Sequence, residues 1–393
     1  MSIIEHIILF SILFIVYVFW GKNIAKKSGS AFWKAAIIPI LLFVCITGSR
    51  YGWGNDFLWY RVQYEFAIYD STQIAFNWLN HSLTFIGLNY VGAFMVYAFI
   101  FIACAFIFLR AYKESSIYMY CFLVPATMYI SCHTIRQGIG IAFVFLVCVF
   151  FHHRKWLFMT LAALIAYYFH STTMITMATL IGIFFVLRNP IHYWISIPLY
   201  LFFAFVFDVH KVAGIADLLS NFITLDNKFQ SYLDSSDKWF GAKAIRDEWI
   251  QGTFSLIMSS LFWISLFYLG YRALKIRENR LVLYVYNTVV LGAIVERAVY
   301  LFEIFRRLTS PMVMFYFVPL GYIFYVYSQD CKKPENFLLK KYFHVGITFI
   351  LAYLVMFWGR FIFLNEAADF FWYHSDEYFD INTFMEFIYD LKN

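Results

Sequence analysis

The sequence has few charged residues for its length. Of its 393 residues, 14% are charged and 62% are hydrophobic, and the mean hydropathy is +0.68. Soluble domains are roughly half apolar and a quarter charged, so this composition excludes an ordinary soluble domain and indicates a bilayer protein. The formal net charge of +6 does not indicate a nucleic-acid partner, because much of the Lys and Arg lies in short connections between apolar runs.

Cysteine is also scarce, and its spacing follows no pattern. The six cysteines lie mostly inside apolar runs: Cys45, Cys104, Cys121, Cys132, Cys148 and Cys331. They show neither the paired spacing of a disulfide framework nor the spacing of metal ligands. The chain also has no Asp-x-Asp run and no cluster of His and Cys that would suggest a divalent-metal site. We therefore expect no metal and no cofactor.

Long apolar stretches, by contrast, recur from end to end. A helix needs about 20 residues to cross the hydrocarbon core, and somewhat fewer where neighbouring helices cover its ends. About twelve such stretches are present, at 3–20, 35–48, 90–109, 117–131, 137–151, 156–170, 172–187, 192–207, 252–271, 281–300, 312–327 and 343–363. They predict an all-α integral membrane protein whose residues 1–393 form a single polytopic domain.

The connections between these stretches predict the orientation of the chain. Glu5 and His6 open the first stretch and Lys22 follows it, the reverse of a signal peptide, so the stretch should be retained as a spanning helix. The basic connections alternate in chain order with the others and can all face the cytoplasm: 21–34, 110–116, 152–155, Arg188, 272–280 and 328–342. By the positive-inside rule, both termini are expected on the non-cytoplasmic side.

Two long segments and the C-terminal tail are then expected outside. They are residues 49–89, residues 208–250 and an acidic, aromatic tail at 365–393. Between Ser71 and Phe85, Trp78 and Leu83 alternate with polar residues. This pattern favours a helix that lies in the membrane interface rather than one that crosses it.

Four groups of polar residues converge on this outer side. They are Gly48–Tyr60 with Glu65 after the second span, His133–Gln137 before the fifth, Phe169–Thr172 between the sixth and seventh, and Glu303 to Pro311 before the eleventh. Charges beside a membrane are costly, so they usually pair, reach the interface or bind a ligand.

Each group also has an ordinary structural interpretation. Arg50 can pair with Asp56, and Arg136 can act as an interfacial anchor. His170 can satisfy a helix end, and Arg306 can be an interfacial cation. Aromatic residues near the surface are expected as belts in any membrane protein, so they are not evidence of sugar binding by themselves.

The order of the groups resembles the EpsG-type family of exopolysaccharide polymerases, which are related in function to the Wzy-type polymerases. The matching residues are Arg50, Gly54-Asn55-Asp56, Tyr60, Ile135-Arg136-Gln137, Phe169-His170-Ser171 and Arg307, across about residues 45–315. The chain departs from the pattern at Asn55, where the family has Thr. Either Arg306 or Arg307 can fill the late position.

The resemblance implies polymerisation of repeat units carried on undecaprenyl pyrophosphate, at the outer face of a bacterial inner membrane. Arginine suits a departing pyrophosphate because its planar guanidinium stays charged and forms bidentate bonds to phosphate oxygens. We therefore expect Arg136 and Arg307 to hold the pyrophosphate, with Arg50 in support. With no metal expected, the arginines alone would neutralise the leaving group.

The acceptor sugar hydroxyl needs a base, and histidine titrates in the appropriate range. His170 is the first candidate, with Asp56 and Glu65 as competitors. Base-assisted direct attack would invert the anomeric centre, whereas a covalent carboxylate intermediate would retain it, and we favour inversion. Tyr60, Gln137 and Glu65 are expected among the substrate-binding residues.

The expected partners are the lipid-linked oligosaccharide, membrane lipids, a chain-length regulator and a flippase. Three other classes stay open. A transporter or flippase of lipid-linked sugars would carry buried charges along a path between both faces. A membrane acyltransferase would use a histidine without several converging arginines, and a structural component of an export complex would use its charges as anchors.

Overall fold

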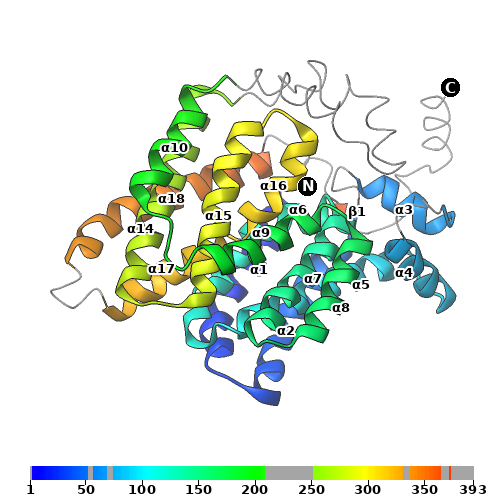
Figure 1. Ribbon diagram of the computed structural model, residues 1–393. Helices are drawn as coiled ribbons and strands as arrows, with labels where there is room; N and C mark the ends of the chain where they lie inside the picture. Colours follow the sequence, from blue (N-terminus) through cyan, green and yellow to red (C-terminus); the bar gives the residue numbers. More distant parts are fainter. Residues whose placement is uncertain are drawn as a thin grey trace.

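The computed structural model describes residues 2–51, 56–68, 74–208, 251–330, 337–363 and 371–372, and almost all of them are helical (Figure 1). One helix overlaps each expected span: α1 (Ser2–Ala25), α2 (Gly29–Gly48), α5 (Tyr90–Arg110), α6 (Met119–Cys132), α7 (Ile135–His152), α8 (Trp156–Phe169), α9 (Thr173–Val186), α10 (Tyr193–Phe205), α14 (Thr253–Ile276), α15 (Arg280–Val299), α17 (Phe317–Asp330) and α18 (Phe337–Phe363). The expected all-helical membrane fold is therefore confirmed in its main feature.

The helices differ in their capacity to cross a bilayer. Among the described residues, eight helical runs are long and apolar enough: α1, α2, α5, α7, α14, α15, α18 and a run from Phe305 to Asp330 that includes α17. The apolar helices α6, α8, α9 and α10 are shorter. A 14-residue helix such as α8 measures about 21 Å, less than the roughly 30 Å of the hydrocarbon core. Twelve crossings therefore stay a prediction, as does the orientation of both termini.

Several helix surfaces carry large exposed apolar side chains. Phe19 on α1, Leu157 on α8 and Trp194 on α10 are all about 70% exposed. Such side chains are expected where lipid replaces water as the surrounding medium, whereas a soluble protein rarely exposes so many. The main apolar core lies between α1, α2, α5–α7, α14, α15 and α17.

Two further helices lie beside the bundle, at its right-hand edge in Figure 1, and come from the segment 49–89. They are α3 (Phe57–Glu65) and α4 (Ile74–Phe85). On α4, Phe76 and Leu83 are buried, whereas Trp78 is 73% exposed. The expected helix at 71–85 is thus present, although α3 was not expected, and its location in the membrane interface stays a prediction.

A small apolar core joins these two helices to the bundle. It contains Tyr60 from α3, Phe76 from α4, Tyr97 from α5 and Ile139 from α7. The Tyr60 and Phe76 rings are 5.4 Å apart, as are those of Phe76 and Tyr97. This packing fixes α3 against the first turns of α7.

Two structural elements differ from the sequence prediction. Glu303–Met314 forms helix α16, where we expected an outer connection up to residue 311. Its polar and apolar faces lower its average hydropathy, so a search for apolar runs misses it. The chain also contains strand β1 (Arg50–Tyr51), which pairs antiparallel with β2 (Phe371–Trp372). This pairing joins part of the tail to the second span.

The basic connections gather at the other end of the bundle. The Arg110 guanidinium lies over the Phe32 ring at 5.2 Å, which joins the connections after α5 and α1. Arg277 Nε lies 3.2 Å from Asp330 Oδ2, which joins those after α14 and α17. Helix η1 (Lys113–Ser116) packs against both α1 and α17. The structure therefore brings together connections that we expect to face the cytoplasm.

We expect the end of the bundle with His170 to face away from the cytoplasm. In a background without native cysteines, Ser171→Cys and His81→Cys should react with an impermeant thiol reagent in intact spheroplasts. Arg154→Cys, in the tight turn between α7 and α8, should react only after permeabilisation; all three positions are exposed. The opposite labelling pattern would show that the orientation is inverted.

Candidate active site

The candidate residues come from four segments that meet at one end of the bundle. Asp56 and Tyr60 lie at the start of α3, and Arg136 lies in the first turn of α7. His170 ends α8, and Arg307 lies on α16. Because α7 packs against α8 and α9, and α9 packs against α16, the bundle holds these segments side by side.

Tyr60 lies at the centre of this arrangement. The Arg136 backbone N–H donates to the Tyr60 hydroxyl at 3.4 Å. Burial raises the pKa of Tyr60 to about 12, the positive charges of Arg136 and Arg307 oppose that rise, and the Asp56 carboxylate adds to it. Tyr60 is therefore a neutral hydroxyl at physiological pH, and the charges of two guanidinium groups and one carboxylate act on it.

Arg136 combines a side-chain cation with the start of a long helix. Helix α7 has 18 residues, and the Thr134 side chain makes no capping hydrogen bond at its N-terminus. The half-buried Arg136 side chain has an Nε with no hydrogen-bond partner within the part of the chain that the structure describes. A helix N-terminus attracts anions through its free N–H groups and its dipole. The charge and the helix end thus both favour an anionic ligand.

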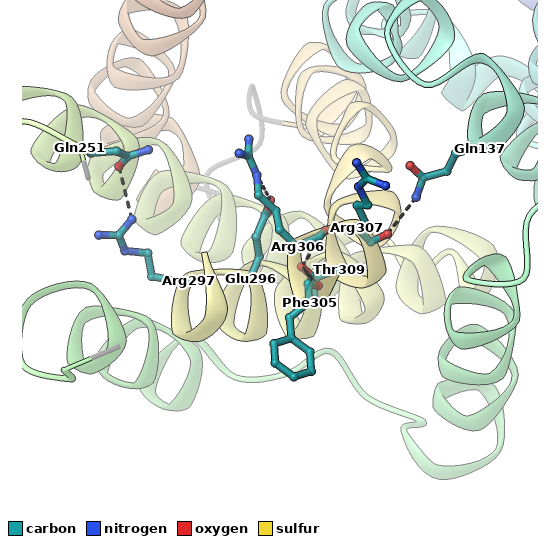
Figure 2. A network of polar contacts seen from close by, with 8 residues as sticks. All are labelled: Gln137, Gln251, Glu296, Arg297, Phe305, Arg306, Arg307 and Thr309. Carbon is teal, nitrogen blue, oxygen red and sulfur yellow. Dashed lines mark hydrogen bonds and ion pairs between the residues drawn. The ribbon is translucent and has the colours of Figure 1, made fainter. Parts of the chain in front are cut away.

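Arg306 and Arg307 point to different neighbours, although they are adjacent in the chain (Figure 2). Arg306 Nε lies 3.9 Å from Glu296 Oε1 on α15. The Arg307 backbone carbonyl instead accepts a hydrogen bond of 2.8 Å from Gln137 Nε2 on α7, and its side chain is exposed. Arg307 is therefore the member of the pair that accompanies Arg136. Gln137, expected to bind substrate, joins α7 to α16.

His170 is fixed at the turn between α8 and α9. Its Nδ1 lies 2.6 Å from Thr172 Oγ1, and its backbone carbonyl accepts a bond of 2.7 Å from Thr173 Oγ1. A Cβ at Gly140 would lie 3.3 Å from His170 Cβ and 2.9 Å from Thr173 Cγ2, so glycine permits this close approach. Since Gly140 follows Arg136 by four residues, about 6 Å along the helix, His170 packs about one turn from Arg136.

Arg50 has a different environment from the other arginines. It is 2% exposed, and its guanidinium donates to the carbonyl oxygens of Thr47 and, at 3.0 Å, Cys132. It also lies 5.1 Å from the Phe94 ring. These contacts join the end of α2 to the segment before α7. They give Arg50 a structural role, and its expected support of the pyrophosphate stays a prediction.

We expect Arg50→Met to destabilise the protein. The substitution leaves buried carbonyls without a donor, at about 1–3 kcal/mol each, and removes the contact with Phe94. The midpoint of thermal unfolding in detergent should fall clearly, while Arg307→Met, at an exposed position, should leave it nearly unchanged. An Arg50→Met protein with native stability and reduced lipid binding would instead assign Arg50 to the ligand.

The two carboxylates proposed as alternative bases have different surroundings. Asp56 precedes α3 and acts electrostatically on Tyr60. Both Glu65 oxygens lie 3.2 Å from Arg61 Nε, and the Arg61 guanidinium lies 4.2 Å from the Tyr90 ring. Glu65 is thus held by an ion pair, and both Asp56 and Glu65 stay predicted alternatives to His170 as the base. The spacing of four residues between Arg61 and Glu65 is the one that places opposite charges together on a helix, so the sequence could have predicted this ion pair.

The sequence analysis missed a second polar group beside α16. Arg297 Nη1 on α15 donates to Gln251 Oε1 at 3.4 Å, and Glu296 pairs with Arg306. Figure 2 draws the Arg297–Gln251 contact on the far side of Arg306 from Gln137. Adjacent charges near the end of an apolar helix are costly. The two charged residues Glu296 and Arg297 inside the expected span 281–300 could therefore have indicated this group from the sequence.

Some predicted features lie outside the described residues, namely Gly54-Asn55, residues 209–250 and most of the tail 365–393. Within the described ranges, the side chains of His, Cys, Asp and Glu form no group of three that could hold a metal ion.

Comparison with protein families supplies an independent result. The family model described as the EpsG family matches residues 33–375, which include every candidate residue named above. Neither the curated proteins nor the solved structures contain a match.

Proposed function

The chain belongs to the EpsG family, and from this premise we propose that it is a polysaccharide polymerase of the membrane. In this proposal it joins oligosaccharide repeat units carried on undecaprenyl pyrophosphate, at the outer face of a bacterial inner membrane. The observation that carries the proposal is that Arg136, Arg307 and Tyr60 lie near one another at one end of α7, with His170 packed about one helical turn from Arg136.

The donor pyrophosphate would occupy the space between α7 and α16. Arg136 offers its Nε–H and the N-terminus of α7. Arg307 offers an exposed guanidinium on a backbone that Gln137 joins to α7. Fixed positive charge next to a low-dielectric membrane stabilises the negative charge that develops on the leaving group. The neutral Tyr60 hydroxyl can donate a further hydrogen bond to a phosphate oxygen.

The transfer step would form one bond and break one bond. The acceptor hydroxyl oxygen attacks the donor's anomeric carbon, the bond from that carbon to the pyrophosphate oxygen breaks, and the pyrophosphate leaves on its lipid. The hydroxyl proton passes to His170, whose ring is oriented by Thr172. Direct attack of this kind inverts the anomeric centre.

The arrangement favours this function over the alternatives. A transporter needs polar groups along a path to both faces, whereas the residues proposed here gather at one end of α7, α8 and α16. An acyltransferase does not need two arginines beside its histidine. Partnership with a flippase and a chain-length regulator fits a polymerase that receives its units across the membrane.

The proposal is tested by reconstitution. Purified protein in lipid is incubated with defined undecaprenyl-pyrophosphate-linked repeat units, and the products are separated by size. We expect a ladder of longer lipid-linked chains whose lengths differ by one repeat unit. Movement of the units across the bilayer without any ladder would identify a flippase instead.

We expect polymerisation to be independent of divalent metal. The sequence has no acidic cation motif, and the proposed site offers arginines to the leaving group. Activity should persist with little loss in a chelator such as EDTA. A reproducible loss that magnesium or manganese restores would show that the pyrophosphate needs a metal.

A further inference from the structure

A second arginine near the same end of the bundle resembles Arg136 in its environment. Arg297, in the last turn of α15, is 8% exposed. Like Arg136, it has an Nε without a hydrogen-bond partner in the described part of the chain. A guanidinium is always charged, and its burial is costly unless its donors are used. An anionic ligand that accepts from this Nε would offset the cost.

The surroundings of Arg297 hold its guanidinium in one orientation. The group lies 4.1 Å from the Tyr300 ring and donates from Nη1 to Gln251 Oε1 at 3.4 Å. Because Gln251 uses its oxygen here, its NH₂ group can donate to a ligand. The Ser259 hydroxyl lies 3.5 Å from the same oxygen but donates to the Leu256 carbonyl at 2.9 Å. The Arg297 Nε–H and the Gln251 amide therefore supply donors to one small region.

Glu296 and Arg306 complete this second group and join it to the first. Their side chains are 3.9 Å apart, so Glu296 balances one of the two positive charges and leaves the group with a net positive charge. A Cβ at Gly292 would lie 2.7 Å from Met312 Cβ, so the glycine allows α15 and α16 to pack closely. Since Arg306 and Arg307 are adjacent on α16, the two groups are neighbours (Figure 2).

We propose that Arg297, Gln251 and the Glu296–Arg306 pair bind the pyrophosphate of a second lipid-linked substrate, the acceptor. This inference rests on the proposed function, because a polymerase that joins two lipid-linked chains must hold two pyrophosphates at once. Both lipids lie in one membrane, so their pyrophosphates must reach the same level and contact different residues. The donor group contains Arg136 and Arg307, whereas the Arg297 group draws on α15, on Gln251 before α14 and on Arg306 of α16.

The test counts bound lipids in the absence of any reaction. Intact protein in nanodiscs is titrated with undecaprenyl pyrophosphate that carries no sugar, and the bound lipids are counted by native mass spectrometry. We expect two for wild type, one for Arg297→Gln, one for Arg136→Gln and none for the double variant. Arg280→Gln, at the opposite end of α15 and with a 78% exposed side chain, should still bind two.

A second variant distinguishes lost binding from lost folding. Arg297→Lys keeps the charge but loses the bidentate donors, so we expect at least a tenfold weaker second site with normal thermal stability. Two lipids bound to a folded Arg297→Gln protein, or a single lipid bound to wild type, would overturn the second site. The ladder of products would still stand in either case, because it tests the proposed function separately.

Discussion

Replacing His170 with alanine is expected to reduce turnover by about a hundredfold or more, the scale of a lost general base. The structure places the Thr172 hydroxyl 2.6 Å from the imidazole Nδ1, and the His170 Cβ packs against Gly140 on α7. Because the ring does not hold the pyrophosphate in this proposal, binding of the lipid-linked donor should stay largely intact. Single-turnover kinetics and donor binding, measured on the same preparation, separate the two effects.

A matched variant tests whether His170 acts chemically. Thr172→Val keeps the imidazole but removes its hydroxyl partner, so it should reduce turnover less than His170→Ala does. It should also shift the pH dependence of turnover, which a purely structural threonine would not. If folded, membrane-inserted His170→Ala protein polymerises at nearly the wild-type rate, His170 is structural. The base must then be sought at Asp56 or at Glu65, whose carboxylate forms an ion pair with Arg61.

Hydropathy was sufficient to locate the apolar helices but not helices of mixed polarity. The helix Ile135–His152 was expected at 137–151, because a continuous apolar run in lipid satisfies its backbone hydrogen bonds by forming a helix. Helix α16 was missed because Arg306 and Arg307 interrupt its apolar face. The pairing of Arg50 with Trp372 was not predictable either, since two residues far apart in the chain carry no periodic signal.

The sequence predicted which candidate residues lie near one another better than it predicted their contacts. Sequence order indicated that Arg136, His170 and Arg307 belong together, and the structure places them at one end of the bundle. Motif order cannot reveal that Arg50 turns into the core to bind main-chain carbonyls, or that Gln137 supports Arg307. Those roles depend on the direction of each side chain, which tertiary packing decides.

Charge alone did not identify every polar residue near the site. Arg297 lies inside a span, where it resembles an anchor at the end of a helix. Its contact with Tyr300 is local in the chain. Its contact with Gln251, by contrast, joins residues that are 46 positions apart. The preorganised group therefore becomes visible only when α14 and α15 are packed together.

Replacing Arg136 is expected to affect the donor more than any other single change. Arg136→Ala removes a half-buried cation at the start of α7 whose Nε has no described protein partner, so donor affinity and turnover should both fall by at least a hundredfold. Loss of a charge-assisted bidentate contact costs about 3 kcal/mol or more, which corresponds to that factor. Arg136→Lys should also be poorly tolerated, because an ammonium group is a point charge without the planar pair of donors.

The control for Arg136 comes from the same pair of helices. Arg154→Ala removes an exposed cation from the turn between α7 and α8, at the other end of α7, and should leave donor binding and turnover unchanged. Donor binding is measured with undecaprenyl pyrophosphate in nanodiscs, and turnover with the full lipid-linked unit. If folded Arg136→Ala binds the donor normally and remains active, the cation that stabilises the leaving group is not Arg136. If His170→Ala is active as well, the proposed catalytic site is wrong, because no residue assigned to leaving-group stabilisation or proton transfer would then be needed.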